Sequence, residues 1–374
     1  MNSTTPITIP LMDLKAQTAP LKEQLMAKIS TALDNTAFCL GPEVEAFERE
    51  FSTYCDLPKG HGVAMNSGTS ALHLALLALG VKPGDDVVTT PFTFVATSWA
   101  ISYCNANPVY ADIVPGTFTL DPVAVEKAIT PKTKAILGVH LYGQPMDLEP
   151  LMDLAKRKGL PLVEDAAQAH GSRYKGRRIG SFGEIAAFSF YPSKNLGACG
   201  EGGIAVTNDA SLAQKMRALR EHGSVKRYYH DTIGFNYRME GIQGAVLRVK
   251  LPHLDGWNAK RQKLASIYNE RLAGSCVTVP RVGPDRTHVY HLYVVRHPRR
   301  DALADFLKSR GIGTAMHYPL PLHLQKAYAY LGLGEGAFPH SEQAARECLS
   351  LPLFPELAES DAIKVADAVL AFRD

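Results

Sequence analysis

The stretch "FSFYPSKNLGACGEGG", from Phe188 to Gly203, places one lysine at the end of an apolar run and ahead of a glycine-rich segment. Burial in a low-dielectric pocket lowers the pKa of an amine, and its neutral form is a nucleophile and a base. The glycines would let the backbone approach a bulky, flat ligand. Lys194 is therefore a candidate catalytic residue. The alternative is a solvated lysine on a loop, where most lysines lie.

A candidate phosphate site lies upstream, in "AMNSGTSALHLALLALG". The apolar lead-in ends at Asn66, a Ser-Gly-Thr-Ser turn follows at 67–70, and then an apolar helix is predicted. Backbone N–H groups and hydroxyls would face one point there, which suits a phosphate at a helix N-terminus. The alternative is an ordinary serine or threonine helix cap. The pattern is not a P-loop, and the glycines after Lys194 do not open a helix as a dinucleotide fingerprint does.

A candidate acid lies in "LPLVEDAAQAHG", where a predicted strand ends in Glu164 and Asp165. A carboxylate at a strand end can hold a protonated ring nitrogen, because it stabilises positive charge in a partly desolvated pocket. The alternative is that Asp165 only caps a turn. In an open parallel sheet, ligands bind outside the carboxyl ends of the strands, so all three stretches fit one site.

The elements that would position these residues are short apolar runs alternating with helical patterns. This alternation predicts βαβ units and an α/β fold with a mostly parallel sheet covered by helices on both faces. Two further helices are predicted at Leu21–Leu33 and Pro42–Cys55. The strands are predicted at 85–92, 134–143, 160–167, 184–191 and 202–209, and the intervening helices at 69–80, 148–159 and 211–223.

The character of the sequence changes after Leu251, where a long amphipathic helix is predicted over 251–274. A strand-like run at 289–297, a helical pattern around 299–312 and a C-terminal helix from Ser360 follow. We therefore predict two domains: a large α/β domain at 1–250 and a smaller α+β domain at 251–374.

The composition excludes several other classes of function. The chain has 374 residues, 46% of them hydrophobic, and a net charge of +3 from 40 basic and 37 acidic residues. This balance argues against nucleic acid or an anionic membrane as the main partner. The apolar runs are too short to span a bilayer, and no signal peptide is expected. Six scattered cysteines without a CxxC pair suggest neither a zinc site nor a disulfide framework, so we expect a cytoplasmic protein.

Together the three stretches are the parts that a pyridoxal phosphate enzyme needs. Their order and spacing resemble the fold type I aminotransferases and, more narrowly, the DegT/StrS family of nucleotide-sugar aminotransferases. The resemblance covers nearly the whole chain and includes "LGPEVEAFEREFSTYC", "MNSGTSALHLAL", "TPFTFVAT", "VHLYGQPMDL", "VEDAAQAHGSRYKGRRIGSFGEIAAFSFYPSKNLGACGEGG" and "GFNYRMEGIQGAVL". It implies an aspartate-aminotransferase-like fold, with a sheet of seven-stranded type in the large domain, which binds the cofactor pyridoxal 5'-phosphate.

The resemblance also implies roles for individual residues. Lys194 resembles the lysine that binds the cofactor covalently, and Asp165 resembles the partner of its pyridinium nitrogen. Gln168 resembles a residue near the ring 3-hydroxyl, and Phe94 resembles the aromatic that stacks on the ring. A core phenylalanine is the alternative for Phe94. The remaining matched positions are Gly68, Thr69 and Ser189 for the phosphate, Asn236 for the same phosphate from the neighbouring subunit, and Arg238, His317 and Tyr318 near the sugar, also from the partner chain.

The function implied is transfer of the amino group of glutamate to a nucleotide-linked keto sugar, at carbon 3, for amino-sugar glycan or natural-product biosynthesis. A homodimer with shared active sites is expected. The loop "HGSVKRYYH" is a candidate for the nucleotide diphosphate or, alternatively, a solvated loop. The sequence also leaves open a carbon-4 keto-sugar or inosose aminotransferase and a catalytically silent regulatory protein. Lys194 with Asp165 argues against the silent protein, and Lys194 also argues against the dehydrating relatives that have histidine in its place.

The carbon-3 prediction depends on His317 and Tyr318 in "AMHYPLPLHLQ", which resemble the pair in carbon-3 members of the family. A histidine and a phenol can donate hydrogen bonds to phosphate or sugar oxygens. The alternative is that both side chains merely pack at the domain interface.

Overall fold

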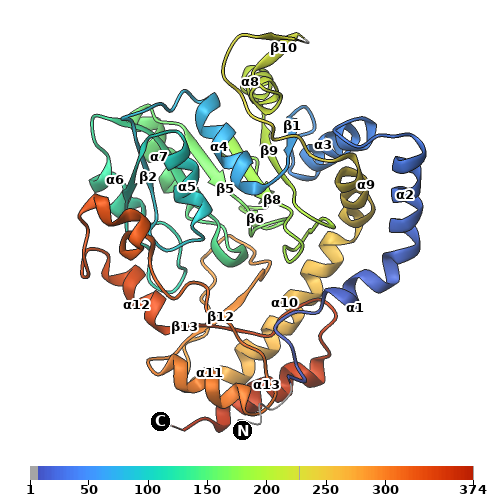
Figure 1. Cartoon of the computed structure of the whole chain (residues 1–374). Helices are drawn as coiled ribbons and strands as arrows, with labels where there is room; N and C mark the ends of the chain where they lie inside the picture. Colours follow the sequence, from blue (N-terminus) through green and yellow to red (C-terminus); the bar gives the residue numbers. More distant parts are fainter. Residues whose placement is uncertain (1–6, 227, 374) are drawn as a thin grey trace.

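The computed structural model describes residues 7–226 and 228–373, and a seven-stranded sheet lies at its centre (Figure 1). The strand order is β1-β9-β8-β5-β4-β2-β3. β9 pairs antiparallel with β1 and β8, and the other neighbours pair parallel. The predicted α/β class with a mostly parallel sheet is confirmed. The strands are β1 (His61–Met65), β2 (Asp86–Thr89), β3 (Asn107–Tyr110), β4 (Thr133–Val139), β5 (Leu162–Asp165), β8 (Ile185–Ser189) and β9 (Gly203–Thr207).

Helices cover both faces of the sheet, because successive strand residues point to opposite sides. In β2, Val87 belongs to one hydrophobic core and Val88 to the other. The core around Val87 is closed by α4 (Gly68–Ala78), α5 (Ala96–Tyr103) and α8 (Ala210–Arg220). The core around Val88 is closed by α2 (Lys22–Asp34), α3 (Pro42–Tyr54), α6 (Pro122–Ala128), α7 (Leu148–Lys158) and α9 (Gly241–Lys250).

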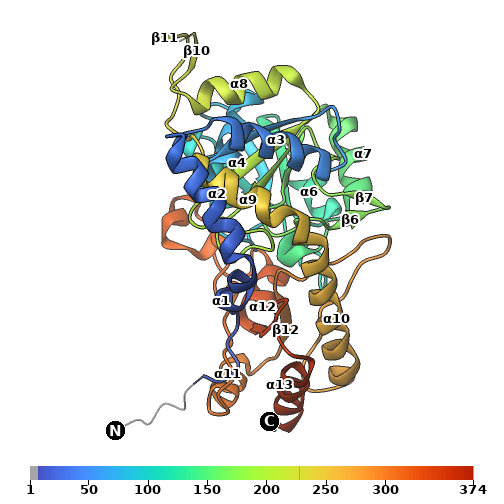
Figure 2. The ribbon, with the colours of Figure 1, turned by 90° about the vertical axis from the view of Figure 1, so that its right-hand side faces the viewer.

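The C-terminal part of the chain has a hydrophobic core of its own, below the sheet in Figures 1 and 2. Ile9 also packs in this core, and the Thr8 amide donates to the Gly311 carbonyl at 2.8 Å. The division at residues 250 and 251 falls where α9 ends, and it stays a prediction. The elements are α10 (Leu254–Leu272), β12 (Tyr293–Arg296), α11 (Arg300–Lys308), α12 (Pro339–Glu347), β13 (Cys348–Leu351) and α13 (Glu359–Ala371).

The predicted helix boundaries agree closely with the structure at both ends of the chain. The helices predicted at Leu21–Leu33 and Pro42–Cys55 are α2 and α3, and the predicted C-terminal helix is α13. The helix predicted from Leu251 begins as a 3₁₀ turn, η3 (Leu251–His253), before α10. Pro252 lies in that turn, and it has no backbone N–H to continue the α-helical bonds from α9.

The remaining elements are short. A hairpin of β10 (Ser224–Lys226) and β11 (Tyr229–His230) projects from the sheet domain beyond α8 (Figures 1 and 2). No helix in the described part of the chain is long and apolar enough to cross a membrane. The other short elements are α1 (Leu14–Thr18), η1 (Ala19–Leu21), η2 (Leu141–Gly143), β6 (Arg173–Tyr174), β7 (Arg177–Arg178), η4 (Leu322–Leu324) and η5 (Lys326–Leu331).

Candidate active site

The predicted acid, Asp165, is the last residue of β5, and its side chain is held by two hydrogen bonds. The Thr97 hydroxyl donates to Oδ2 at 2.8 Å, and the Ala167 amide donates to Oδ1 at 3.2 Å. Burial raises the pKa of Asp165, while the bond from Thr97 and the charge of Lys194 act in the opposite direction. A cationic ligand nitrogen beside this carboxylate would favour its ionised form.

Glu164, the other acid of this strand end, faces away from that position. Its carboxylate accepts hydrogen bonds from the amides of Gly180, Phe182 and Gly183, and lies 3.0 Å from Nε2 of His140. Burial raises its pKa, but these donors outweigh burial and hold the pKa below the usual value. Adjacent residues in a strand point to opposite faces of the sheet. Glu164 therefore anchors a loop on one face, while Asp165 points to the other face at the carboxyl end of β5.

Lys194 follows β8 and is half-buried. Burial lowers its pKa to about 8, and the charge of Asp165 opposes this shift. In the described part of the chain, no ion pair or hydrogen bond holds its ammonium. The neutral amine is therefore far more abundant near pH 7 than in an ordinary lysine, as expected of a lysine in a low-dielectric pocket.

The predicted phosphate cradle is the turn at residues 67–70, which begins α4, and one of its side chains caps this helix. The Ser67 hydroxyl accepts from the Ser70 amide at 3.1 Å and caps α4, so the capping interpretation holds for this pair. Gly68 follows directly, and a Cβ there would lie 2.6 Å from Cβ of Ser189. No hydrogen bond engages the Thr69 hydroxyl among the described residues. The first turn of α4 thus lies against the end of β8, and the absence of a side chain at Gly68, which is itself buried, permits this close approach.

Phe94, Gln168 and Tyr318 come together although they are far apart in sequence. The Phe94 side chain is 50% exposed, which excludes the core alternative. Its ring centroid lies 5.8 Å from that of Tyr318. Nε2 of Gln168 donates to the Tyr318 hydroxyl at 3.2 Å, and Oε1 accepts from the Tyr142 amide at 2.7 Å.

These contacts correct one expectation about Tyr318 and its neighbour His317. The family resemblance implied that both reach the site from the partner chain, but Tyr318 is hydrogen-bonded to Gln168 of its own chain. Nδ1 of His317 lies 2.8 Å from the Ser350 hydroxyl, and its carbonyl accepts from the Tyr142 hydroxyl. Burial and then the charge of Lys194 lower the pKa of His317 to about 4. The stretch that carries both residues is held by a backbone bridge between Ala315 and Ser350 and by the Leu322 amide, which donates to the Pro91 carbonyl at 2.7 Å.

Asn236 and Arg238 are not brought to these residues. Arg238 forms a backbone bridge with Met65, the last residue of β1, and is half-buried. Asn236 bridges Glu221 through its backbone and has an exposed side chain. Within the described residues neither side chain contacts Lys194, Asp165 or the cradle. A role at the site of the same chain is therefore unsupported for Asn236.

Four further residues surround the predicted site, and none of them was expected there from the sequence. Thr97 contacts Asp165, and Tyr142 contacts both Gln168 and His317. His170 is fully buried between aromatic rings, and burial followed by the charge of Lys194 lowers its pKa to about 3. His291 is also buried, and the pKa falls for the same two reasons. A hydroxyl pair one helical turn apart, Thr93 and Thr97, was the one available signal.

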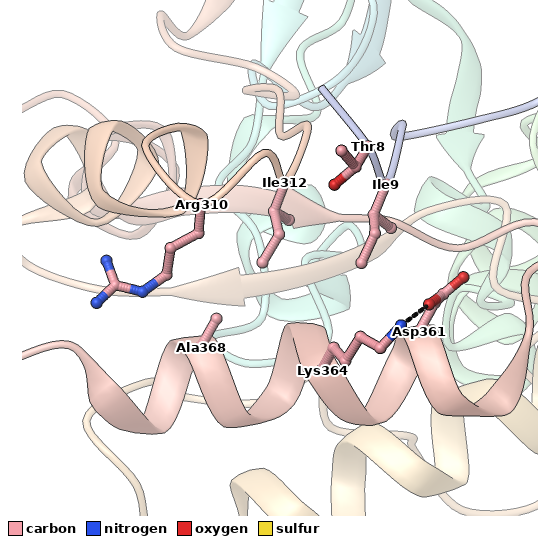
Figure 3. Close-up of a pocket in the computed structure, with 7 residues that line it drawn as sticks. All are labelled: Thr8, Ile9, Arg310, Ile312, Asp361, Lys364 and Ala368. Atoms are coloured by element: carbon pink, nitrogen blue, oxygen red, sulfur yellow. Dashed lines mark hydrogen bonds and ion pairs between the residues drawn. The ribbon is translucent and has the colours of Figure 1, made fainter. Parts of the chain in front are cut away.

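A separate pocket of about 320 Å³ lies between the first described residues and α13 (Figure 3). Its lining includes Arg310, Asp361 and Lys364, and the Lys364 ammonium is already bound by Asp361 at 2.8 Å. None of the predicted site residues lines this pocket. The candidate active site therefore remains at the carboxyl ends of the strands, around Lys194 and Asp165.

Comparisons with known proteins point to one family. A sequence model of the DegT/DnrJ/EryC1/StrS aminotransferase family matches residues 20–370. The chain is 49% identical over 362 residues to dTDP-3-amino-3,4,6-trideoxy-alpha-D-glucose transaminase of Streptomyces venezuelae, covering 96% of this chain and 95% of that protein. It is 46% identical to the pleiotropic regulatory protein of Geobacillus stearothermophilus, covering 98% and 99%.

A solved structure gives the same result at the level of the fold. The crystal structure of S. venezuelae DesV in complex with a ketimine intermediate superposes with a TM-score of 0.95 at 48% identity. The match covers 99% of this chain and 100% of DesV. The fold type I aminotransferase architecture, with its seven-stranded sheet, is therefore confirmed.

Proposed function

The chain belongs to the DegT/DnrJ/EryC1/StrS aminotransferase family, and from this we propose that it transfers the amino group of glutamate to carbon 3 of a keto sugar linked to a nucleoside diphosphate. Membership makes it a nucleotide-sugar aminotransferase. The finer choice of carbon 3 is supported by the relative from S. venezuelae, whose name gives a 3-amino sugar, and by the His317–Tyr318 pair. The single observation that carries the reaction is the half-buried Lys194 amine beside Asp165.

The family depends on pyridoxal 5'-phosphate, and the residues of this chain fit it. A Cβ at Gly68 would collide with Ser189, so this glycine lets the N-terminus of α4, whose backbone N–H groups suit a phosphate, lie against the end of β8. Asp165 is buried beside Lys194, which suits a ring nitrogen and an attachment point. We propose that Lys194 holds the cofactor covalently and that Gly68, Thr69 and Ser189 hold its phosphate. When bound, the cofactor supplies an electron-accepting ring that carries the amino group between the two substrates.

The residues around the ring have separate tasks in this proposal. The Asp165 carboxylate keeps the ring nitrogen protonated. Phe94, exposed at the sheet edge, covers one face of the ring, and the Gln168 amide orients the ring 3-hydroxyl. Nζ of Lys194 takes up the proton that leaves the α-carbon of glutamate and later returns a proton to the sugar carbon, as a base with a pKa near neutrality can.

Substrate contacts are proposed on both sides of the site. His317 and Tyr318 of the same chain would donate to sugar or phosphate oxygens. Asn236 would reach the cofactor phosphate of the neighbouring subunit, since its side chain is exposed. Arg238, two residues further along the chain, would lie near the sugar in the same neighbouring site. The hairpin at 222–230 stays a candidate for the diphosphate, and Arg227 within it lies outside the described residues.

The test of the proposed function is product analysis. Purified protein is incubated with glutamate and a mixture of 3-keto and 4-keto nucleotide sugars, and products are assigned by mass spectrometry and NMR. We expect an amine at carbon 3. An amine found only at carbon 4, or only on an inosose, would replace the carbon-3 proposal and leave the aminotransferase assignment in place.

The regulatory alternative is favoured by one observation, the 46% identity to a protein named as a pleiotropic regulator. Lys194 and Asp165 are both present, which speaks against a silent protein. A visible cofactor absorption band that bleaches on addition of glutamate would support the enzyme. A band that glutamate leaves unchanged would support the regulator.

A further inference from the structure

The hydroxyl of Thr97 contacts Asp165, the carboxylate proposed to pair with the ring nitrogen of the cofactor. Thr97 lies in the first turn of α5, is 1% exposed, and donates to Oδ2 of Asp165 at 2.8 Å. The two residues are 68 positions apart in the sequence. The contact therefore depends on the fold, which brings the first turn of α5 to the end of β5.

A second threonine, Thr93, extends this hydrogen bond into a chain. Oγ1 of Thr93 lies 3.1 Å from Oγ1 of Thr97, and Thr93 is also buried. An ionised carboxylate only accepts, so the single proton of the Thr97 hydroxyl points to Asp165. Thr93 must then be the donor to Thr97. The result is an ordered chain, Thr93 to Thr97 to Asp165.

We propose that Thr97 is a positioning residue for the reaction, whose hydroxyl fixes the rotation of the Asp165 carboxylate and keeps it ionised against the cofactor nitrogen. The inference rests on the proposed role of Asp165. The Ala167 amide holds only Oδ1, at 3.2 Å, so Thr97 supplies the shorter of the two bonds that set the carboxylate plane. A hydrogen bond to a charged group is among the stronger ones in proteins.

Other groups that act on Asp165 must be accounted for in a pH experiment. Lys194 and His140 each favour its ionised form. Tyr318, from the C-terminal part of the chain, is close enough that Asp165 contributes to raising the pKa of the phenol. None of these groups is altered by a substitution at Thr97. A shift in pH dependence on such a substitution can therefore be assigned to the missing hydroxyl.

The experiment measures pyridoxal 5'-phosphate binding by absorbance between pH 5 and 9, with Thr97→Val, Thr97→Ser and Asp165→Asn. Thr97→Val keeps the shape and removes the donor. We expect its Kd to rise about ten- to a hundredfold, the range for one hydrogen bond to a charged group. Its acid limb should move to higher pH by about one unit, because an unsupported carboxylate is protonated more easily. Thr97→Ser should restore both values.

Thr89→Val is the matched control. Thr89 is a fully buried threonine of β2 whose hydroxyl donates to the Leu137 carbonyl at 2.8 Å, away from Asp165. It should lower the free energy of unfolding without moving the acid limb. If Thr97→Val does not fold, Thr97→Ala gives the same comparison.

The outcomes separate this inference from the proposed function. Wild-type Kd values for Thr97→Val at every pH, with weakened binding by Asp165→Asn, would overturn the role of Thr97 alone. An equal shift of the acid limb by Thr89→Val would also overturn it. Unchanged binding by Asp165→Asn would overturn the proposed pairing of Asp165 itself.

Discussion

At the residue scale, the site works through the contrast between two neighbouring titratable groups. Burial lowers the pKa of Lys194 to about 8 and raises that of Asp165. Each shift favours the neutral form, and each charge partly opposes the shift of the other. Binding of a cationic ring nitrogen would restore the charge of Asp165. The lysine is thereby left as the base, which is the division of roles that the proposed reaction needs.

The first prediction concerns Lys194. Lys194→Ala should purify without a borohydride-reducible link to the cofactor and should lose turnover, because no other amine replaces it. The readout is the mass of the protein after borohydride treatment. Near wild-type transamination by this variant would show that another residue holds the cofactor.

The pH dependence of cofactor attachment follows from the same group. The neutral amine is the reactive form and predominates above the pKa of about 8. The attachment rate should therefore rise from pH 6, reach half its maximum near that pKa and level off about one pH unit above it. Stopped-flow absorbance of cofactor-free protein mixed with pyridoxal 5'-phosphate measures this rate. A rate still rising steeply above pH 10 would mean that the lysine has its ordinary pKa.

Asp165 gives a prediction about rate rather than folding. Asp165→Asn keeps the shape and removes the charge opposite the ring nitrogen. We expect folded protein and a loss of about 10²-fold or more in kcat, the scale for one preorganised electrostatic contact. A thermal melt checks the fold, and an unchanged rate and cofactor spectrum would refute the pairing.

At the element scale, the first turn of α4 must approach the end of β8 without a side chain between them. Gly68→Ala would place a Cβ 2.6 Å from Cβ of Ser189. We expect a loss of about 1–3 kcal/mol in the free energy of unfolding, as for other overpacked sites, together with weaker cofactor binding. Denaturant melts and absorbance titration measure these effects.

Gly256 is the matched control for that substitution, since it is an exposed glycine inside α10 and no atom lies within 4 Å of the place that a Cβ would take. Gly256→Ala should stabilise the protein by about 0.5–1 kcal/mol through helix propensity and leave cofactor binding unchanged. Equal effects of the two substitutions would contradict the close approach at Gly68.

At the scale of the whole molecule, the proposed homodimer gives a role to the exposed side chain of Asn236. A two-fold interface would supply it to both sites at once. Lys194→Ala and Asn236→Ala subunits, each inactive alone, should regain activity on mixing, because one site of each heterodimer is then intact. No recovered activity after subunit exchange has been verified by mass spectrometry would count against sharing.

The sequence by itself determined the fold class and the residues at the strand ends. Alternating apolar runs predicted the parallel sheet. Asp165 lies at the end of a predicted strand, Lys194 follows another, and the 67–70 turn follows an apolar lead-in. These features depend on local order along the chain, which periodicity and turn residues report.

Only the tertiary structure decided which residues meet. Thr97 reaches Asp165, Tyr142 reaches His317, and Tyr318 reaches Gln168 of its own chain, across 68, 175 and 150 positions. Such contacts depend on strand order and on how the C-terminal part returns to the sheet edge, and neither leaves a local signal. The exposure of Phe94 was undecided for the same reason, because an aromatic at a strand end has the same pattern in a core and at an open edge.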